Sequence, residues 1–86
     1  MTFKEYQNKS RETAIQPEQG NNITYLTLGL CGESGEVAEK IKKIIRDDNG
    51  KITEQSKKAI SKEIGDTLWY CAELASELDL DLGKIA

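Results

Sequence analysis

The chain has 86 residues, and its 15 acidic and 12 basic side chains give a net charge of −3 without a single histidine. The absence of histidine excludes Ser-His-Asp and Cys-His catalysis and every imidazole-ligated metal site. The charged residues lack the basic clustering that a nucleic-acid surface requires, so DNA and RNA are not expected as partners. We expect one domain over residues 1–86, whose small core favours association with a partner subunit.

The cysteines and the hydropathy of the chain bear on its compartment. Cys31 and Cys71 are too few for a zinc site, and both lie among apolar positions, which predicts buried free thiols. The sequence contains no secretory signal and no apolar run of about 18 residues. We therefore expect a cytoplasmic protein that does not associate with a membrane.

Helical spacing of the apolar residues predicts an all-α fold, beginning with an N-terminal helix. Thr2 and Glu5 have the spacing of a capping box, which predicts a first helix over about residues 3–14. The polar stretch 16–22, which contains Pro17, ends that helix.

Two longer helices are predicted in the rest of the chain. Asn22 is expected to cap a helix that runs to about Arg46, the segment 47–50 to form a turn, and Thr53 to cap the next helix. A fourth helix starts at about Asp81. Two long helices with so short a connection favour an antiparallel hairpin. Its apolar stripes consist of Ile23, Leu26, Leu30, Val37, Ile41 and Ile44 on one helix and Ile60, Ile64, Leu68, Cys71, Leu74, Ala75 and Leu78 on the other.

Each long helix carries a pair of acidic residues, Glu33 with Glu36 and Glu63 with Asp66. The spacing i, i+3 places both members of a pair on one face of their helix. If the turn 47–50 is centred between its last two residues, positions equally far from it lie opposite each other. The two pairs then face each other at the middle of the hairpin, so four carboxylates converge.

Four clustered negative charges repel one another unless a cation neutralises them. Oxygen ligands without imidazole or thiolate favour a hard ion, Mg²⁺ or Mn²⁺ before Ca²⁺. A solvated helix face is the common explanation of any single acidic pair, but two pairs in facing register favour a metal site.

Several neighbours lie on or near the acidic face, and each has two interpretations. Lys40 is placed to reach a phosphate oxygen, or it forms an ion pair with Glu36. Gly29 leaves room for a ligand, or it permits close helix packing. Tyr70 lies on the acidic face, whereas Trp69 points away from the apolar stripe and is expected to be exposed. Either ring can stack on a nucleobase, but a subunit contact is favoured for Trp69.

The segments LGLCGESGEVAEKIKK (28–43) and KEIGDTLWYCAELASELDLDLGKIA (62–86) resemble the MazG-like all-α nucleoside triphosphate pyrophosphohydrolases. The hallmark of that superfamily is ExxE followed after a spacer by ExxD, which residues 33–36 and 63–66 match. The first predicted helix also resembles that of the family, at Tyr6, Gln7, Arg11 and Thr13.

The resemblance implies hydrolysis of a (deoxy)nucleoside triphosphate to a monophosphate and pyrophosphate, a house-cleaning activity on the nucleotide pool. It implies that Mg²⁺, or Mn²⁺, is held by Glu33, Glu36, Glu63 and Asp66, with Glu33 or Glu36 accepting the proton of the attacking water. We expect Lys40 and Tyr70 to bind the substrate. The resemblance further implies a homodimer or homotetramer in which hairpins from two subunits form a four-helix bundle.

Members of this family continue beyond the segment that matches Ile85 and Ala86, so residues 1–86 are expected to lack the last family helix. The alternative from another class is a non-catalytic helical dimerisation module that keeps the acidic cluster as a structural cation site.

Overall fold

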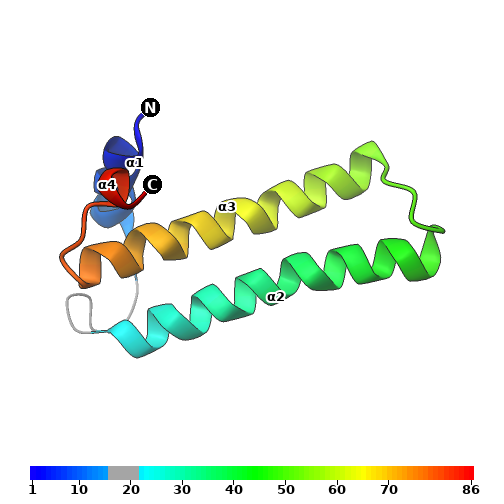
Figure 1. Cartoon of the computed structure of the whole chain (residues 1–86), viewed down its shortest axis with the longest axis horizontal. Coiled ribbons are helices and arrows are strands. Elements are labelled where there is room, and N and C mark those ends of the chain that lie inside the picture. Colours follow the sequence, from blue (N-terminus) through cyan, green and yellow to red (C-terminus); the bar gives the residue numbers. More distant parts are fainter. Residues whose placement is uncertain (16–21) are drawn as a thin grey trace.

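The computed structural model describes residues 1–15 and 22–86, which form four helices and no strand (Figure 1). The predicted all-α fold is therefore confirmed. The expected helix break at residues 16–21 lies outside the described residues. The helices are α1 (Phe3–Thr13), α2 (Ile23–Asp47), α3 (Glu54–Glu77) and α4 (Leu82–Ile85).

Helices α2 and α3 form the predicted antiparallel hairpin, which is the long body of the molecule (Figure 1). Each begins at the expected cap: the Asn22 side chain accepts a hydrogen bond from the Tyr25 N–H at 3.3 Å, and Thr53 Oγ1 accepts one from the Ser56 N–H at 3.1 Å. In the turn between them Gly50 has φ of +76°, a left-handed conformation that glycine adopts without steric cost.

Helices α1 and α4 lie at the end of the hairpin away from this turn, beside both chain termini (Figure 1). Gln7 joins them to α3. Its side-chain Nε2 donates to Ser76 Oγ at 3.0 Å and to the Leu80 carbonyl at 2.9 Å, while its Oε1 accepts from the Leu82 N–H at 2.9 Å. Within the described part of the chain α1 packs on α3 and α4, whereas α2 packs on α3 alone. Helix α3 is thus the element that every other helix shares.

The core of the chain is small. The radius of gyration is 14.9 Å, against about 12 Å for a compact globule of this length. Because a long two-helix hairpin has no third layer along most of its length, much of its apolar stripe stays open to solvent. The buried apolar residues of the described chain are Leu26, Ile44, Ala72, Ala75 and Leu82.

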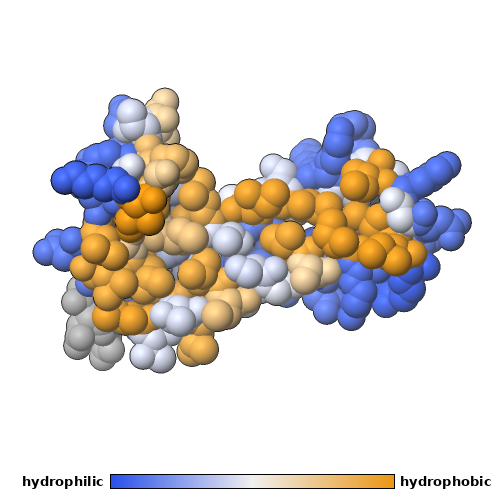
Figure 2. Space-filling model, in the orientation of Figure 1, coloured by the Kyte–Doolittle hydropathy of each residue, from blue (hydrophilic) through white to orange (hydrophobic). Residues whose placement is uncertain are grey.

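Apolar side chains on the hairpin are correspondingly exposed, and Figure 2 shows apolar surface running along it. Ile41 and Ile64 belong to the stripes that the sequence predicts as core, yet they are 39% and 57% exposed. The exposed apolar residues of α2 and of the turn and helix that follow include Leu28, Ile41, Ile45, Ile52 and Ile64.

Two further expectations from the sequence are wrong. Cys31 is exposed rather than buried, because it lies two residues after Gly29, and about 200° of helical rotation turns it away from α3; Cys71 is half-buried, and both thiols are free. Trp69 is half-buried rather than exposed, because α1 packs on α3 and its residues Tyr6, Ser10 and Thr13 line a hollow together with Trp69. Among residues 1–15 and 22–86 we find no helix with the length and apolar character needed to span a membrane.

Candidate metal centre

Three acidic side chains meet across the middle of the hairpin. Glu33 of α2 and Glu63 and Asp66 of α3 each bring one carboxylate oxygen to within 4.8 Å of the others. Glu63 is buried, and Glu33 and Asp66 are half-buried. The juxtaposition follows from helix geometry, since Glu63 and Asp66 are one turn apart and Glu33 and Asp66 are equally far from the turn.

The electrostatics of this group are those of an uncompensated negative cluster. The pKa of the Glu33 carboxyl is raised by a hydrogen-bonding interaction with Glu63, by burial, and by the negative charges of Glu63, Asp66 and Glu36. None of the salt bridges within the described residues involves Glu33, Glu63 or Asp66. Three hard oxygen ligands in one place, without an internal cation, fit a divalent metal ion.

Glu36, the fourth predicted ligand, lies outside this group of three. Its side chain is exposed, although its charge contributes to the raised pKa of Glu33. Glu36 is one turn from Glu33 on α2, but it is not among the residues whose carboxylate oxygens meet. The structure therefore places three of the four predicted carboxylates together and the fourth at their edge.

Aromatic side chains border the acidic group. A hollow of about 400 Å³ is lined by Glu33, Asp66, Trp69 and Tyr70. The two rings meet edge to face, with centroids 5.1 Å apart. Burial raises the pKa of Tyr70, and so do its interactions with Tyr25, Glu33 and Asp66. Tyr70 thus lies on the acidic face, where the sequence places it.

Gly29 and Lys40, the other two predicted neighbours of the acidic group, do not line this hollow. A Cβ atom at Gly29 would lie 2.2 Å from Cε1 of Tyr70, so the space at this glycine holds that ring and leaves no room for a ligand. Helix packing is therefore the correct interpretation of Gly29. Lys40 is half-buried and does not line the hollow. It makes no salt bridge with Glu36 in the described chain.

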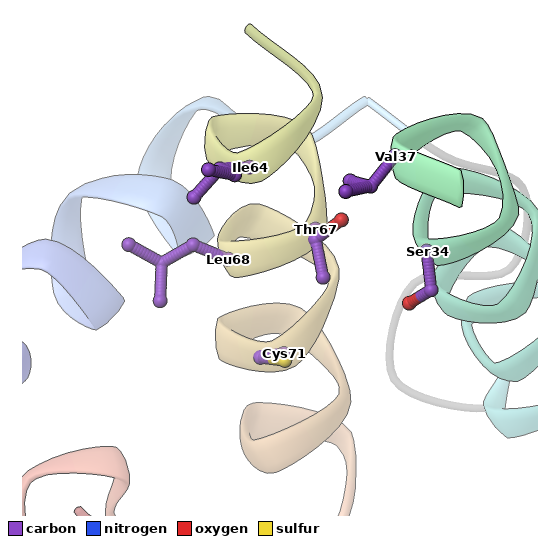
Figure 3. Close-up of a pocket in the computed structure, with 6 residues that line it drawn as sticks. All are labelled: Ser34, Val37, Ile64, Thr67, Leu68 and Cys71. Atoms are coloured by element: carbon purple, nitrogen blue, oxygen red, sulfur yellow. The ribbon is translucent and has the colours of Figure 1, made fainter. Parts of the chain in front are cut away.

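A second hollow, also of about 400 Å³, lies along the hairpin next to the acidic group (Figure 3). Ser34 and Thr67 lie in it, but each hydroxyl donates to a carbonyl of its own helix at 2.8 Å. Because these hydroxyls are satisfied, the hollow offers little polar chemistry and is an apolar groove. We call it the hairpin groove; its residues are Ser34, Val37, Ile64, Thr67, Leu68 and Cys71.

A second charged cluster, which the sequence does not reveal, joins α1 to the end of α3. Glu73 is fully buried and accepts hydrogen bonds from Ser10 Oγ at 2.7 Å and Arg11 Nη1 at 2.9 Å. Arg11 also pairs with Glu77, which accepts a hydrogen bond from the Asn22 N–H at 2.6 Å. The i, i+4 spacing of Glu73 and Glu77 indicates that they share a face of α3. It does not indicate that Arg11 pairs with them, because packing decides which face of α1 meets α3.

The hairpin and its facing acids define an all-α protein with a candidate centre for a hard cation. The chain belongs to the MazG nucleotide pyrophosphohydrolase domain family, whose sequence model matches residues 21–86. It is 42% identical over 85 residues to the gene 37 protein of Mycobacterium phage L5, a match that covers 93% of this chain and 75% of the phage protein. No solved structure matches the chain significantly.

Proposed function

We propose that this protein hydrolyses a (deoxy)nucleoside triphosphate to a nucleoside monophosphate and pyrophosphate, and that it acts on the nucleotide pool of the cytoplasm. The observation that carries the proposal is the meeting of Glu33, Glu63 and Asp66 within 4.8 Å without an internal cation. Membership of the MazG family supports it. The adjoining hollow, which both carboxylates and aromatic rings line, suits a metal-bound phosphate chain joined to a planar base.

In this proposal Glu33, Glu63 and Asp66 hold Mg²⁺ or Mn²⁺, and Glu36 completes the acidic set from its edge. When bound, the ion neutralises phosphate charge and lowers the pKa of a coordinated water. The buried Glu63 fixes one ligand oxygen between two helices, which limits the number of geometries that the site can adopt.

The chain's own residues then have distinct roles. Glu33 or Glu36 accepts the proton of the water that attacks the α-phosphorus; the exposed position of Glu36 leaves its carboxylate open to solvent. Tyr70 forms one wall of the hollow and contacts the substrate. Lys40, one turn beyond Glu36 on α2, contributes positive charge toward a phosphate oxygen.

We also propose a homodimer or homotetramer in which two hairpins form a four-helix bundle. The hairpin groove supports this assembly, because Ile64 within it is 57% exposed and, among the described residues, α2 packs on α3 alone. Light scattering is expected to give a multiple of the 9.6 kDa chain mass. A monomer at micromolar concentration would contradict the assembly.

Pyrophosphate release from a panel of ribo- and deoxyribonucleoside triphosphates tests the activity. We expect release with Mg²⁺ or Mn²⁺ and none in EDTA. Glu63→Gln removes a cluster carboxylate and is expected to be inactive, whereas Glu54→Gln alters a surface acid of the same helix and serves as the matched control. Metal binding without turnover of any nucleotide would instead support the non-catalytic dimerisation module.

The same assay assigns the proton acceptor. Glu33→Gln and Glu36→Gln are compared for Mn²⁺ affinity and for kcat. The variant that keeps its metal affinity but loses turnover identifies the proton acceptor. Loss of a metal ligand would instead lower both the metal affinity and turnover.

A further inference from the structure

We propose that Gly29 is a positioning residue for Tyr70, and that its missing side chain sets the place of this aromatic wall beside the acidic group. The inference rests on the proposed function, because it concerns how the same hollow receives its nucleotide. It adds one residue that lies outside the acidic motif.

Helices α2 and α3 approach each other closely at Gly29 and Tyr70. A Cβ atom built at Gly29 would lie 2.2, 2.5 and 2.7 Å from Cε1, Cζ and Cδ1 of Tyr70. These atoms belong to a rigid ring, so the whole ring would have to move. Gly32 and Gly65, also in α2 and α3, have nothing within 4 Å of the same position. The requirement for glycine is therefore specific to position 29.

Other residues of the hairpin surround the ring of Tyr70. Glu33 follows Gly29 by one turn of α2, so the two share a face. Trp69 meets the ring of Tyr70 edge to face, with centroids 5.1 Å apart. The ring of Tyr70 thus lies against Gly29 and Trp69, and it lines the same hollow as Glu33.

Displacing this ring has a defined functional consequence. A methyl group at position 29 pushes Tyr70 either into the hollow or away from α2. Both movements change the wall that contacts the nucleotide, whereas Glu33, Glu63 and Asp66 meet one turn farther along the hairpin. Nucleotide affinity should therefore fall while metal affinity is kept.

The test is Gly29→Ala with Gly32→Ala as the matched control on the same helix. We expect KM for the nucleotide to rise about tenfold or more in Gly29→Ala, with kcat and Mn²⁺ affinity changed by less than about threefold. All three quantities should be unchanged in Gly32→Ala. In a Tyr70→Leu background, Gly29→Ala should add no further rise in KM, because the ring that it displaces is gone.

A spectroscopic readout makes the test independent of turnover. Trp69 is the single tryptophan of the chain, so its fluorescence and near-ultraviolet circular dichroism report on the contact with Tyr70. Gly29→Ala should alter this signal without substrate, and Gly32→Ala should not. If no nucleotide is hydrolysed, the proposed function fails, but these spectra still decide whether Gly29 positions Tyr70.

An unchanged Trp69 signal in Gly29→Ala, or a KM effect that persists in the Tyr70→Leu background, would overturn the inference. If Gly29→Ala does not fold by far-ultraviolet circular dichroism, Gly29→Ala/Tyr70→Leu should fold again, because the clash has been removed. Failure of that double variant to fold would equally overturn it.

Discussion

Helix α3 carries two groups of carboxylates that differ in whether a cation of the same chain pairs with them. At its C-terminal end Glu73 and Glu77 are buried against Arg11, and Glu73 also accepts a hydrogen bond from Ser10. At its middle Glu63 and Asp66 face another carboxylate, that of Glu33. The first group is paired with a cation inside the chain, whereas no salt bridge among the described residues involves the second.

The pKa shifts of Arg11 and Glu33 show the same contrast. Burial by itself lowers the pKa of Arg11, but its hydrogen bonds to Glu77 and Glu73 outweigh this and the pKa is raised, so the pairing favours the charged form. Every influence on Glu33 disfavours its charged form and raises its pKa. Removing the cation of the first region would leave buried carboxylates uncompensated, whereas the carboxylates of the second region repel one another, and a bound cation would relieve that repulsion.

Breaking the internal pair should have the largest effect. Arg11→Met leaves Glu73 and Glu77 without this cation, and we expect a loss of about 3 kcal/mol in unfolding free energy, at the low end for a buried pair because Arg11 is 27% exposed. Urea denaturation followed by circular dichroism measures it. Arg46→Met removes an exposed ion pair with Asp47 and should change stability little. Equal effects of the two variants would refute the contrast.

Neutralising the facing acids should act on turnover instead. Glu63→Gln or Asp66→Asn is expected to reduce kcat on the order of 10²-fold or more, with the apo fold as stable as before or more so, because a repelling charge is removed. A double substitution should cost no more than the worse single one, since the metal is already lost. Full activity of either variant with metal still bound would mean that these residues are a solvated helix face.

A divalent ion should stabilise the chain through the facing acids. At a concentration ten times its Kd, Mg²⁺ adds about 1.4 kcal/mol by mass action, roughly 5–10 °C in Tm for a domain of this size. Differential scanning fluorimetry in EDTA and in millimolar Mg²⁺ measures the shift. Arg11→Met should retain it and Glu63→Gln should lose it. The same Tm with and without metal would contradict the site.

The smallest effect concerns Glu5, another acid that is satisfied within the chain. Hydrogen bonds from the backbone and the side chain of Thr2 lower the pKa of Glu5 below its ordinary value of 4.5. Since the folded-state pKa is the lower one, this contribution to stability is present above pH 4.5 and is lost as the pH falls through the folded-state pKa. The difference in Tm between the wild type and Glu5→Gln should therefore shrink between pH 5 and pH 3. A difference in Tm that grows as the pH falls would contradict the lowered pKa of Glu5.

Local features of the sequence predict most of the secondary structure. Thr2, Asn22, Thr53 and Asp81 cap their helices as expected, because a capping side chain acts on the next turn of its own helix. The register of the hairpin also follows from the sequence, since a short turn leaves little freedom in how two helices align. This is why the facing of Glu33 and Asp66 is predictable.

Tertiary packing decided the rest. The sequence places Glu36 with the other three acids, but the packed hairpin brings only Glu33 of α2 to Glu63 and Asp66 and leaves the Glu36 side chain exposed. The burial of Trp69 and the pairing of Arg11 with Glu73 depend on which face of α1 meets α3, and no local signal encodes that choice. The role of Gly29 likewise depends on a ring that lies across the hairpin. Caps, periodicity and turn length act within a few residues and are legible in the chain, whereas these contacts join residues from separate helices and exist only when the helices are packed.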